Sequence, residues 1–569
     1  MHSPATNILL LLSTTLIASA YQDDVRFTEL AEKLTLRSET VPTGAGVAVT
    51  QVEASASGTA DNYVPDGANS EFTGKAITDQ TGGGGNSSHA TTVGVNLFGN
   101  ETSIAPGINT IDVYFADDWL YSRGWFTGFT TPSEDNRLQN HSWIGTTTSS
   151  AASLRMDFAV VNERNDAEDD GFLPIAGLNN GNTTTVPAIY GSMYNGITVG
   201  RSNGGHSQGG TVYDTAGRLK PEIVAPSGLT SYATPMVTAT AALLIENAGT
   251  DTAAKDQLTL KAILLAGADK SAFASWSQSS TQPIDAIYGA GQLDAYESYF
   301  IQEGGQQAVD STIGAYGWNL STIAPGTDHD YNISVPPGFT LRNLSALITW
   351  NRIVTKSGRN YSAANLPDLE LSLSDNSDPN NLTTLQSSNS SIDNLEHIWR
   401  DASNALPEGD YTLTVRTDSS ADYALAWRSQ LYQDYTLWKA AAFTAATPVA
   451  EQDADDDPEG DGVINQLEQA FGGDPEATDD TSILPQFEIA TDQGNDYLQI
   501  SFRRPDFENG LTYTVETVNN LNDTWSSATA DVEIISINDE SDGYQRHTYR
   551  CVEPITANDQ GYLRVVVSQ

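Results

Sequence analysis

The sequence is poor in cysteine, in long apolar runs and in positive charge. It has one cysteine, Cys551, in 569 residues, so no intrachain disulfide can form. Beyond the N-terminus, no apolar run reaches the ~18 residues of a membrane-spanning helix. Lys plus Arg number 27 against 73 Asp plus Glu, which gives a formal net charge of −46. This excess argues against nucleic acid and anionic membranes as partners. It fits either simple solubility or a saline habitat, where salt screens self-repulsion.

Residues 1–20 have the pattern of a secretory signal. An apolar core from Ile8 to Ile17 precedes the small residues Ala18-Ser-Ala20. We therefore expect bacterial-type export to a secreted or cell-surface location; a buried N-terminal helix is the alternative. Without disulfides, bound calcium is the expected cross-link. Residues 21–43 are polar and short, and we expect them to form a lead-in to the first domain.

Residues 44–300 alternate short apolar strands with helical segments, which predicts a parallel α/β domain. The expected strands are rich in apolar and small residues and cover 44–54, 109–115, 137–145, 157–162, 173–181 and 194–200. In such sheets, functional groups gather at the carboxyl ends of the strands.

A small-residue turn followed by an apolar helix carries Ser231. A serine there lies near unpaired backbone N–H groups and the positive end of the helix dipole. An acyl-transfer nucleophile and its oxyanion hole can be built together at such a place. The alternative is that Ser231 or Thr230 is only the N-cap of the helix.

Two further segments carry candidates for the base and the acid. A Gly-rich loop, 82–85, leads to His89, and histidine is the usual general base near neutral pH. Gln51 and Glu53 end the first expected strand and, being two residues apart, share one face of it. Either side chain could point into a cleft. An amide-rich turn at Asn179 and Asn180 could supply an oxyanion donor, although Asn-Gly is also an ordinary turn dipeptide.

Several segments, in order along the chain, together resemble the subtilisin-like serine proteases (subtilases). They are Ser88-His-Ala-Thr-Thr-Val-Gly94, Asn140-His-Ser-Trp-Ile-Gly145, Gly217-Arg-Leu-Lys-Pro-Glu-Ile-Val-Ala-Pro226, Thr230-Ser-Tyr-Ala-Thr-Pro235 and Gly289-Ala-Gly-Gln-Leu-Asp-Ala295. The resemblance covers residues 40–300. It implies a subtilisin-like parallel-sheet domain that hydrolyses peptide bonds in proteins or peptides, without an organic cofactor.

The resemblance implies roles for individual residues. Ser231 would be the nucleophile, His89 the general base and Asn179 the oxyanion donor, with Asn180 as runner-up. Ser142 and Trp143 would border the main specificity pocket of the cleft.

The sequence departs from the family pattern at two places. The family has an aspartate where this chain has Gln51, and we expect Glu53 to orient His89 instead. The family also has glycine where this chain has Leu229, whose side chain could crowd the oxyanion hole.

After residue 300 the pattern changes to short strands of alternating apolar and polar residues. This predicts a β-sandwich over 301–435 and a second small β domain over 485–569. The strand 409–415 resembles those of β-sandwich modules in secreted bacterial peptidases. We expect a stabilising role for the first module, with substrate binding as the alternative.

An acidic linker, 444–480, joins these two modules. Within it, Asp457 to Glu468 has the spacing of an EF-hand loop, with carboxylates at positions 1, 3, 5 and 12 and a glycine at position 6. We expect a structural calcium ion there; a solvated charge run is the alternative. The predicted ligands are Asp457, Glu459, Asp461, Val463, Asn465 and Glu468.

The sequence therefore predicts a subtilisin-like α/β domain followed by two all-β sandwich-like domains joined by an acidic calcium-loop linker. The expected function is that of a secreted serine endopeptidase. The alternative is a catalytically impaired subtilisin-like scaffold that acts as a binding or surface protein. The sequence leaves the peptide preference and the oligomeric state open.

Overall fold

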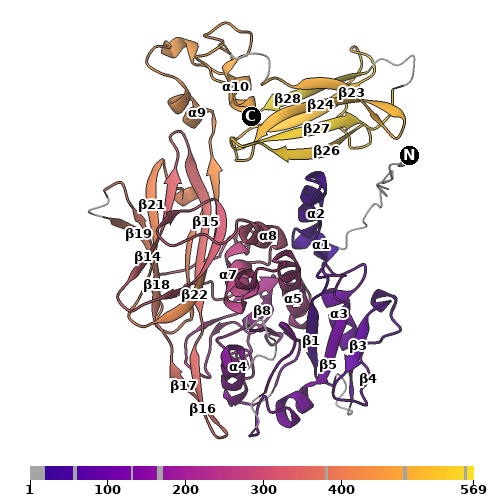
Figure 1. The fold of residues 1–569 in the computed structure, drawn as a ribbon, viewed down its shortest axis with the longest axis vertical. Helices are drawn as coiled ribbons and strands as arrows, with labels where there is room; N and C mark the ends of the chain where they lie inside the picture. Colours follow the sequence, from indigo (N-terminus) through magenta and orange to yellow (C-terminus); the bar gives the residue numbers. More distant parts are fainter. Residues whose placement is uncertain are drawn as a thin grey trace, which may run out of the picture.

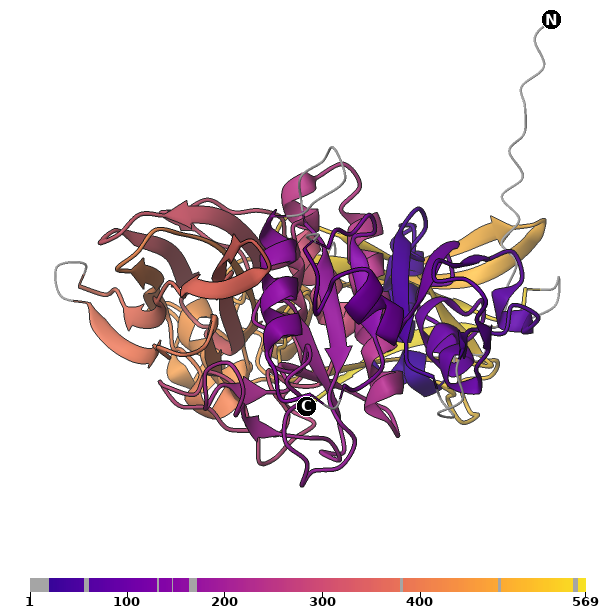
Figure 2. The same ribbon diagram turned by 90° about the horizontal axis from the view of Figure 1, so that it is seen from below.

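The computed structural model describes residues 20–55, 61–129, 132–145, 147–162, 171–378, 382–478, 483–555 and 561–569. Apart from Ala20, the expected signal segment lies outside the described residues. Figure 1 shows an α/β unit, a β-sandwich beside it, and a C-terminal β unit at the opposite end of the molecule from the hairpin β16–β17. Seen from below, the sandwich lies at one end of the molecule and the first strands of the α/β unit lie at the other (Figure 2).

A seven-stranded sheet with the order β11-β8-β7-β6-β1-β5-β3 organises the α/β unit. Every pairing in it is parallel. Its strands are β1 (Ala48–Glu53), β3 (Ala76–Asp79), β5 (Thr110–Phe115), β6 (Leu138–His141), β7 (Leu173–Gly177), β8 (Ile197–Arg201) and β11 (Ile223–Ala225). The middle strands are buried on both faces, as expected for parallel strands covered by helices. The α/β architecture and the all-β parts after it confirm the predicted fold class.

Two helices bring the candidate catalytic segments to this sheet. The helix α3 (Ser88–Phe98) is capped by the hydroxyl of Ser87, which accepts from the Ala90 N–H. The helix α5 (Thr230–Asn247) is buried almost all round, as its apolar sequence predicted. Its N-cap residue is Leu229, which has no side chain able to cap it. Neither Thr230 nor Ser231 is the N-cap, so that alternative is wrong.

The prediction of a strand over 157–162 is also wrong. These residues end the helix α4 (Ala151–Asn162). The buried residues Ala152, Met156, Ala159 and Val160 follow helical spacing. A short apolar run does not by itself distinguish a strand from a buried helix, and only the longer window shows the period.

The lead-in is helical and packed. It forms α1 (Ala20–Asp24) and α2 (Phe27–Leu36). Val25, Leu30 and Leu34 are buried in the same core cluster as the sheet. Arg26 bonds to Asp294 at 2.9 Å, at the start of helix α8 (Ala295–Glu303).

The sandwich is made of a five-stranded sheet, β12-β14-β21-β18-β19, and a four-stranded sheet, β13-β22-β15-β20. Its strands are β12 (Ser311–Thr312), β13 (Tyr316–Ile323), β14 (Asp328–Val335), β15 (Thr340–Trp350), β18 (Leu369–Asp375), β19 (Thr383–Ser388), β20 (Leu395–Arg400), β21 (Gly409–Thr417) and β22 (Ala421–Tyr432). A separate hairpin pairs β16 (Ile353–Ser357) with β17 (Asn360–Asn365) and packs on α4.

Both faces of the four-stranded sheet are buried, and β22 shows how. Tyr423, Leu425 and Trp427 point into the sandwich core. Ala424 and Ala426, which alternate with them, join the core of the α/β unit against helix α7 (Gln257–Gly267). The sandwich therefore shares a hydrophobic core with the α/β unit, which supports the expected stabilising role.

A buried ion pair also joins these two units, and its loss is expected to destabilise the chain strongly. Arg352 contacts the carboxylates of Asp157 and Asp214, and its side chain is 3% exposed. The substitution Arg352→Met leaves Asp157 buried without its cation, which costs about 3–5 kcal/mol. Denaturant unfolding measures this loss. The matched control is Arg416→Met at the exposed Arg416–Asp328 pair, where about 1 kcal/mol or less is expected. Equal effects of the two substitutions would contradict the prediction.

The C-terminal unit pairs a four-stranded sheet, β23-β24-β27-β26, with the two strands β25 and β28. The strands are β23 (Gln486–Asp492), β24 (Asn495–Pro505), β25 (Thr512–Val518), β26 (Val532–Asp539), β27 (Tyr544–Cys551) and β28 (Tyr562–Ser568). Helix α10 (Asn465–Phe471), which starts within the acidic loop, contributes Ala470 and Phe471 to the core of this unit. The acidic loop is therefore built onto the C-terminal unit, and helix α9 (Tyr435–Ala442) leads into it from the sandwich.

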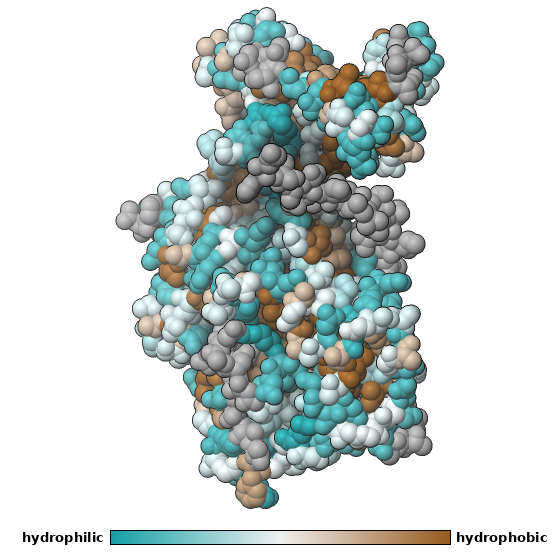
Figure 3. Space-filling view, turned by 45° about the vertical axis from the view of Figure 1, so that its right-hand side comes forward, coloured by the Kyte–Doolittle hydropathy of each residue, from teal (hydrophilic) through white to brown (hydrophobic). Residues whose placement is uncertain are grey.

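Hydrophilic side chains cover most of the face that Figure 3 shows, with hydrophobic residues in small patches. This agrees with the net charge of −46. Among the described residues, no helix is both long enough and apolar enough to span a membrane.

Candidate functional site

Three segments meet at the carboxyl end of the parallel sheet. Glu53 is the last residue of β1, His89 is the second residue of α3, and Ser231 is the second residue of α5. The helices α3 and α5 pack against each other, and the ring of Tyr232 lies 5.8 Å from that of His89. Polar groups from distant parts of the chain thus gather at the end of the sheet where α/β proteins place their sites.

Glu53 is the acid that reaches His89. Its Oε2 lies 2.9 Å from His89 Nδ1. Glu53 is fully buried, whereas the His89 side chain is 28% exposed. An acid bonded to Nδ1 leaves Nε2 as the free nitrogen of the imidazole, which is the arrangement a general base needs.

Gln51 lies beside Glu53 on the same face of β1. Its Nε2 donates to Glu53 Oε1 at 2.9 Å and to the Ala90 carbonyl at 3.0 Å. Strand periodicity left both side chains open, and the resemblance led us to expect Glu53 to orient His89. In the structure the Glu53 carboxylate bonds to His89, and the Gln51 amide bonds to that carboxylate.

Burial and hydrogen bonding shift both partners. Burial raises the pKa of Glu53, although its bonds with His89 and Gln51 partly oppose this. The hydrogen bond that His89 donates to Glu53 raises the pKa of His89, against the effect of burial. The carboxylate thus makes His89 a stronger base than a free imidazole.

The side chain and the backbone N–H of Ser231 are not engaged in the fold. Among the residues that the structure describes, neither its hydroxyl nor its backbone N–H has a hydrogen-bond partner. The N–H belongs to the first turn of α5, where the helix offers no acceptor. Hydroxyl–imidazole bonds are often loose in a free enzyme and tighten with substrate.

The two asparagines of the amide-rich turn make different contacts. Asn180 Oδ1 accepts the Thr230 N–H at 3.0 Å and so caps α5 from another segment. The backbone of Asn179 is fixed by Ser207 through bonds of 3.2 and 2.8 Å. The Asn179 side chain is half-buried and makes no hydrogen bond within the described part of the chain. The Asn179 amide is therefore available to donate to a ligand.

The backbone explains why leucine is tolerated before Thr230. Leu229 has φ −136° and ψ 145°, an extended conformation that any residue adopts. Its side chain is 36% exposed. Glycine is therefore not required at this position.

Ser142 is buried, and its hydroxyl donates to the Ser231 carbonyl at 2.9 Å. It also accepts from Asn140 Nδ2 at 3.0 Å. Ser142 thus supports the turn that carries Ser231. Trp143 is half-buried and bonds through Nε1 to His141 Nδ1 at 3.3 Å.

Sequence reasoning missed the polar network beneath Trp143. His141 is fully buried and bonds through Nε2 to Gln139 Oε1 at 2.9 Å. Gln139 in turn donates to Glu134 at 2.7 Å. Burial lowers the pKa of His141 to about 3 and raises that of Glu134 to about 7. The signal available was the alternation of Gln139 and His141 on one face of a short strand.

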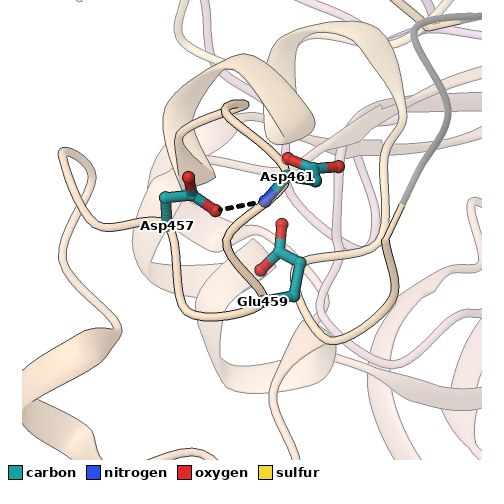
Figure 4. A group of neighbouring side chains, drawn as sticks. All are labelled: Asp457, Glu459 and Asp461. Carbon is teal, nitrogen blue, oxygen red and sulfur yellow. Dashed lines mark hydrogen bonds between the residues drawn. The ribbon is translucent and has the colours of Figure 1, made fainter.

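The acidic loop folds around its own carboxylates (Figure 4). Ligand oxygens of Asp457, Glu459 and Asp461 lie within 4.8 Å of one another. Asp457 accepts the N–H groups of Gly460, Asp461 and Gly462. Both oxygens of Glu459 and Asp461 Oδ2 are buried without a hydrogen-bond partner among the described residues.

Glu459 also lies against the carboxyl of Glu468, which is fully buried at the twelfth position of the loop. Burial raises the pKa of Glu459, and the neighbouring Asp461 and Asp457 raise it further. Crowded, partly desolvated carboxylates with unfilled oxygens are costly unless a cation or a proton joins them. The residues of this loop therefore fit an oxygen-liganded calcium ion.

No protein-family model matches the sequence. No curated protein sequence matches it significantly. Solved structures similar to this chain include the prenylagaramide maturation protease PagA, with 19% identity over 44% of this chain and 92% of that chain and a TM-score of 0.30. The patellamide maturation protease PatA has 17% identity over 46% and 98% of the two chains, with a TM-score of 0.30. Tripeptidyl peptidase 2 has 11% identity over 84% and 56%, with a TM-score of 0.27.

The chain forms a parallel sheet with helices in the order that the sequence motifs predicted. The segments that carry Glu53, His89 and Ser231 meet at one end of this sheet. The α/β unit of this chain has a subtilisin-like fold.

Proposed function

We propose that the chain is a serine endopeptidase that cleaves peptide bonds through Ser231, His89 and Glu53. The observation that carries this proposal is the 2.9 Å bond between Glu53 Oε2 and His89 Nδ1, on a helix that packs against the start of the Ser231 helix. Acid, base and nucleophile are all present, and the acid bonds to the nitrogen of the imidazole that faces away from the nucleophile in such triads. Protein or peptide substrates follow from the resemblance of the fold to proteases.

The chemistry follows from these positions. His89 Nε2 takes the Ser231 proton as Oγ attacks the substrate carbonyl, which forms a tetrahedral oxyanion. The Ser231 N–H and the Asn179 amide donate to that oxyanion. The protonated His89, stabilised by the Glu53 carboxylate, then gives its proton to the leaving amine. Water, activated by His89, hydrolyses the acyl-enzyme and restores Ser231.

Labelling of the purified protein with a fluorophosphonate serine probe tests this function. Covalent labelling at Ser231, together with hydrolysis of a casein or peptide substrate, supports it. Absence of labelling in the folded protein favours a subtilisin-like scaffold that only binds its partners. The residue that motivates this second function is Gln51, which occupies the place of the family's aspartate.

We further propose that the protein is exported and carries a structural calcium ion. Residues 21–36 pack as ordered helices from the first residues after the expected cleavage point, so removal of 1–20 would leave the lead-in intact. The calcium ligands would be the side chains of Asp457, Glu459, Asp461, Asn465 and Glu468 and the Val463 carbonyl. Val463 also belongs to the C-terminal core, which would couple the ion to that unit.

Removal of calcium is expected to destabilise the C-terminal unit. Without the ion, the carboxylates of the loop repel one another next to Val463 and Phe471 of the core. We expect EGTA to lower the midpoint of thermal unfolding of this unit, and added calcium to restore it. The variant Asp461→Asn/Glu468→Gln should no longer respond to either treatment. An unchanged midpoint in EGTA for the unmodified protein would contradict the proposal.

A further inference from the structure

Gln51, on the same strand as Glu53, makes side-chain hydrogen bonds that a packing role does not require. Gln51 is fully buried, and its amide donates two hydrogen bonds, one to its own strand and one to helix α3. One bond reaches Glu53 Oε1 at 2.9 Å, and the other reaches the Ala90 carbonyl at 3.0 Å, one residue after His89. The amide thus links the strand that carries the acid to the helix that carries the base.

The Ala90 carbonyl fixes which way this amide faces. If the amide were flipped, Gln51 Oε1 would point at the Ala90 oxygen, and two acceptors would meet without a proton. Gln51 must therefore present an N–H group to Glu53. Its own Oε1 is buried and has no hydrogen-bond partner within the described residues. An unsatisfied buried acceptor lowers the stability of the fold.

The N–H group of Gln51 favours the ionised state of Glu53. Its hydrogen bond to Oε1 is stronger when that oxygen belongs to a carboxylate than when it belongs to a neutral carboxyl group. When His89 carries its proton on Nδ1, Oε2 accepts from it and both carboxylate oxygens are satisfied. A protonated Glu53 would instead donate from Oε2 to Nδ1 of the Nε2–H tautomer, and Gln51 would then bond to a neutral carboxyl group. Burial alone favours that protonated form, since it raises the pKa of Glu53.

We propose that Gln51 is a positioning residue, which keeps Glu53 ionised and aimed at Nδ1 of His89. The inference rests on the proposed triad and extends it. Gln51 occupies the position of the family's aspartate, and the acid, Glu53, lies two residues further along the same strand face. The Gln51 amide holds the Glu53 carboxylate in place. Glu53 can then act from a fully buried position.

The substitution Gln51→Met, which keeps length but removes the donor, tests this role. A hydrogen bond to a charged group, once lost, is expected to move the acidic limb of the labelling rate upward by about one to two pH units. The direction follows because Glu53, less stabilised as an anion, takes up a proton at a higher pH. The same change is expected to replace the Nδ1–H form of His89 with the Nε2–H form near pH 6–7, as seen by ¹⁵N-histidine NMR.

A matched control separates this role from simple packing. Gln257→Met removes another buried glutamine amide, at the start of α7, and should leave both readouts unchanged. If Gln51→Met does not fold, Gln51→Glu has the same shape and cannot donate to both acceptors, so it should shift both readouts in the same direction. A wild-type pH profile and a wild-type His89 tautomer in the Gln51 variant would overturn the inference while leaving the peptidase intact. If the unmodified protein is not labelled at all, the peptidase proposal fails, and the His89 tautomer in the two proteins still decides the role of Gln51.

Discussion

Ser231→Ala is expected to abolish labelling by the serine probe and to lower peptide hydrolysis by a factor on the order of 10⁶, the loss seen when a serine protease loses its nucleophile. The physical reason is that the acyl-enzyme can no longer form, and only the oxyanion donors and substrate binding remain. The hydroxyl of Ser231 has no structural partner within the described residues, so its removal should leave the thermal midpoint nearly unchanged. Labelling rate, hydrolysis rate and thermal unfolding are the measurements.

The neighbouring Ser227 provides the control. It lies in the same turn, and among the described residues its Oγ accepts only the Leu229 N–H, at 3.4 Å. Ser227→Ala should keep the labelling rate of the unmodified protein. If Ser231→Ala is labelled as fast as the unmodified protein, another nucleophile carries the activity and the proposed triad is wrong.

Glu53→Gln is expected to lower the rate of labelling and hydrolysis by about 10⁴, because an amide can hold His89 in the wrong tautomer. The acidic limb of the pH profile should move to lower pH as well. Glu53 raises the pKa of His89, so without the carboxylate the imidazole loses its proton at a lower pH. This shift is opposite to the one expected for Gln51→Met, so the two variants distinguish loss of the acid from loss of its support.

Glu134→Gln is the control for loss of a buried carboxylate. Burial raises the pKa of Glu134 to about 7, so a neutral amide replaces a group that is already partly neutral at pH 7. We expect it to keep most of the activity. Unchanged activity in both Glu53→Gln and Glu53→Ala would show that Glu53 is not the acid.

Local patterns carried much of the fold prediction because the periods of strands and helices are local. The alternation of apolar strands and helices predicted the parallel sheet, and the apolar run after Ser231 predicted a buried helix. The segment 157–162 failed because six apolar and polar residues fit either period. The contact of Ala424 and Ala426 of β22 with the α/β unit could not be predicted, because a small apolar side chain is compatible with many packing partners.

Part of the candidate site could likewise be predicted from local sequence, and part could not. The motifs around His89 and Ser231 identified the candidate base and nucleophile, and the apolar run after Ser231 predicted that this serine begins a helix. The resemblance ranked Asn179 above Asn180 as oxyanion donor, although both are amides in one turn. Only the structure shows their contacts: Asn180 Oδ1 accepts the Thr230 N–H, whereas the Asn179 side chain has no hydrogen bond within the described residues.

The sequence by itself determined the subtilisin-like α/β fold with β-rich parts after it, the excess of acidic charge and the spacing of the acidic loop, because each is written in composition or in short-range periodicity. Only the tertiary structure decided which side chain faces His89. Gln51 and Glu53 share one face of β1, and a period of two residues cannot choose between them. The position of the first turn of α3 decided it, because it brings the Ala90 carbonyl to the amide of Gln51 and the His89 imidazole to the carboxylate of Glu53.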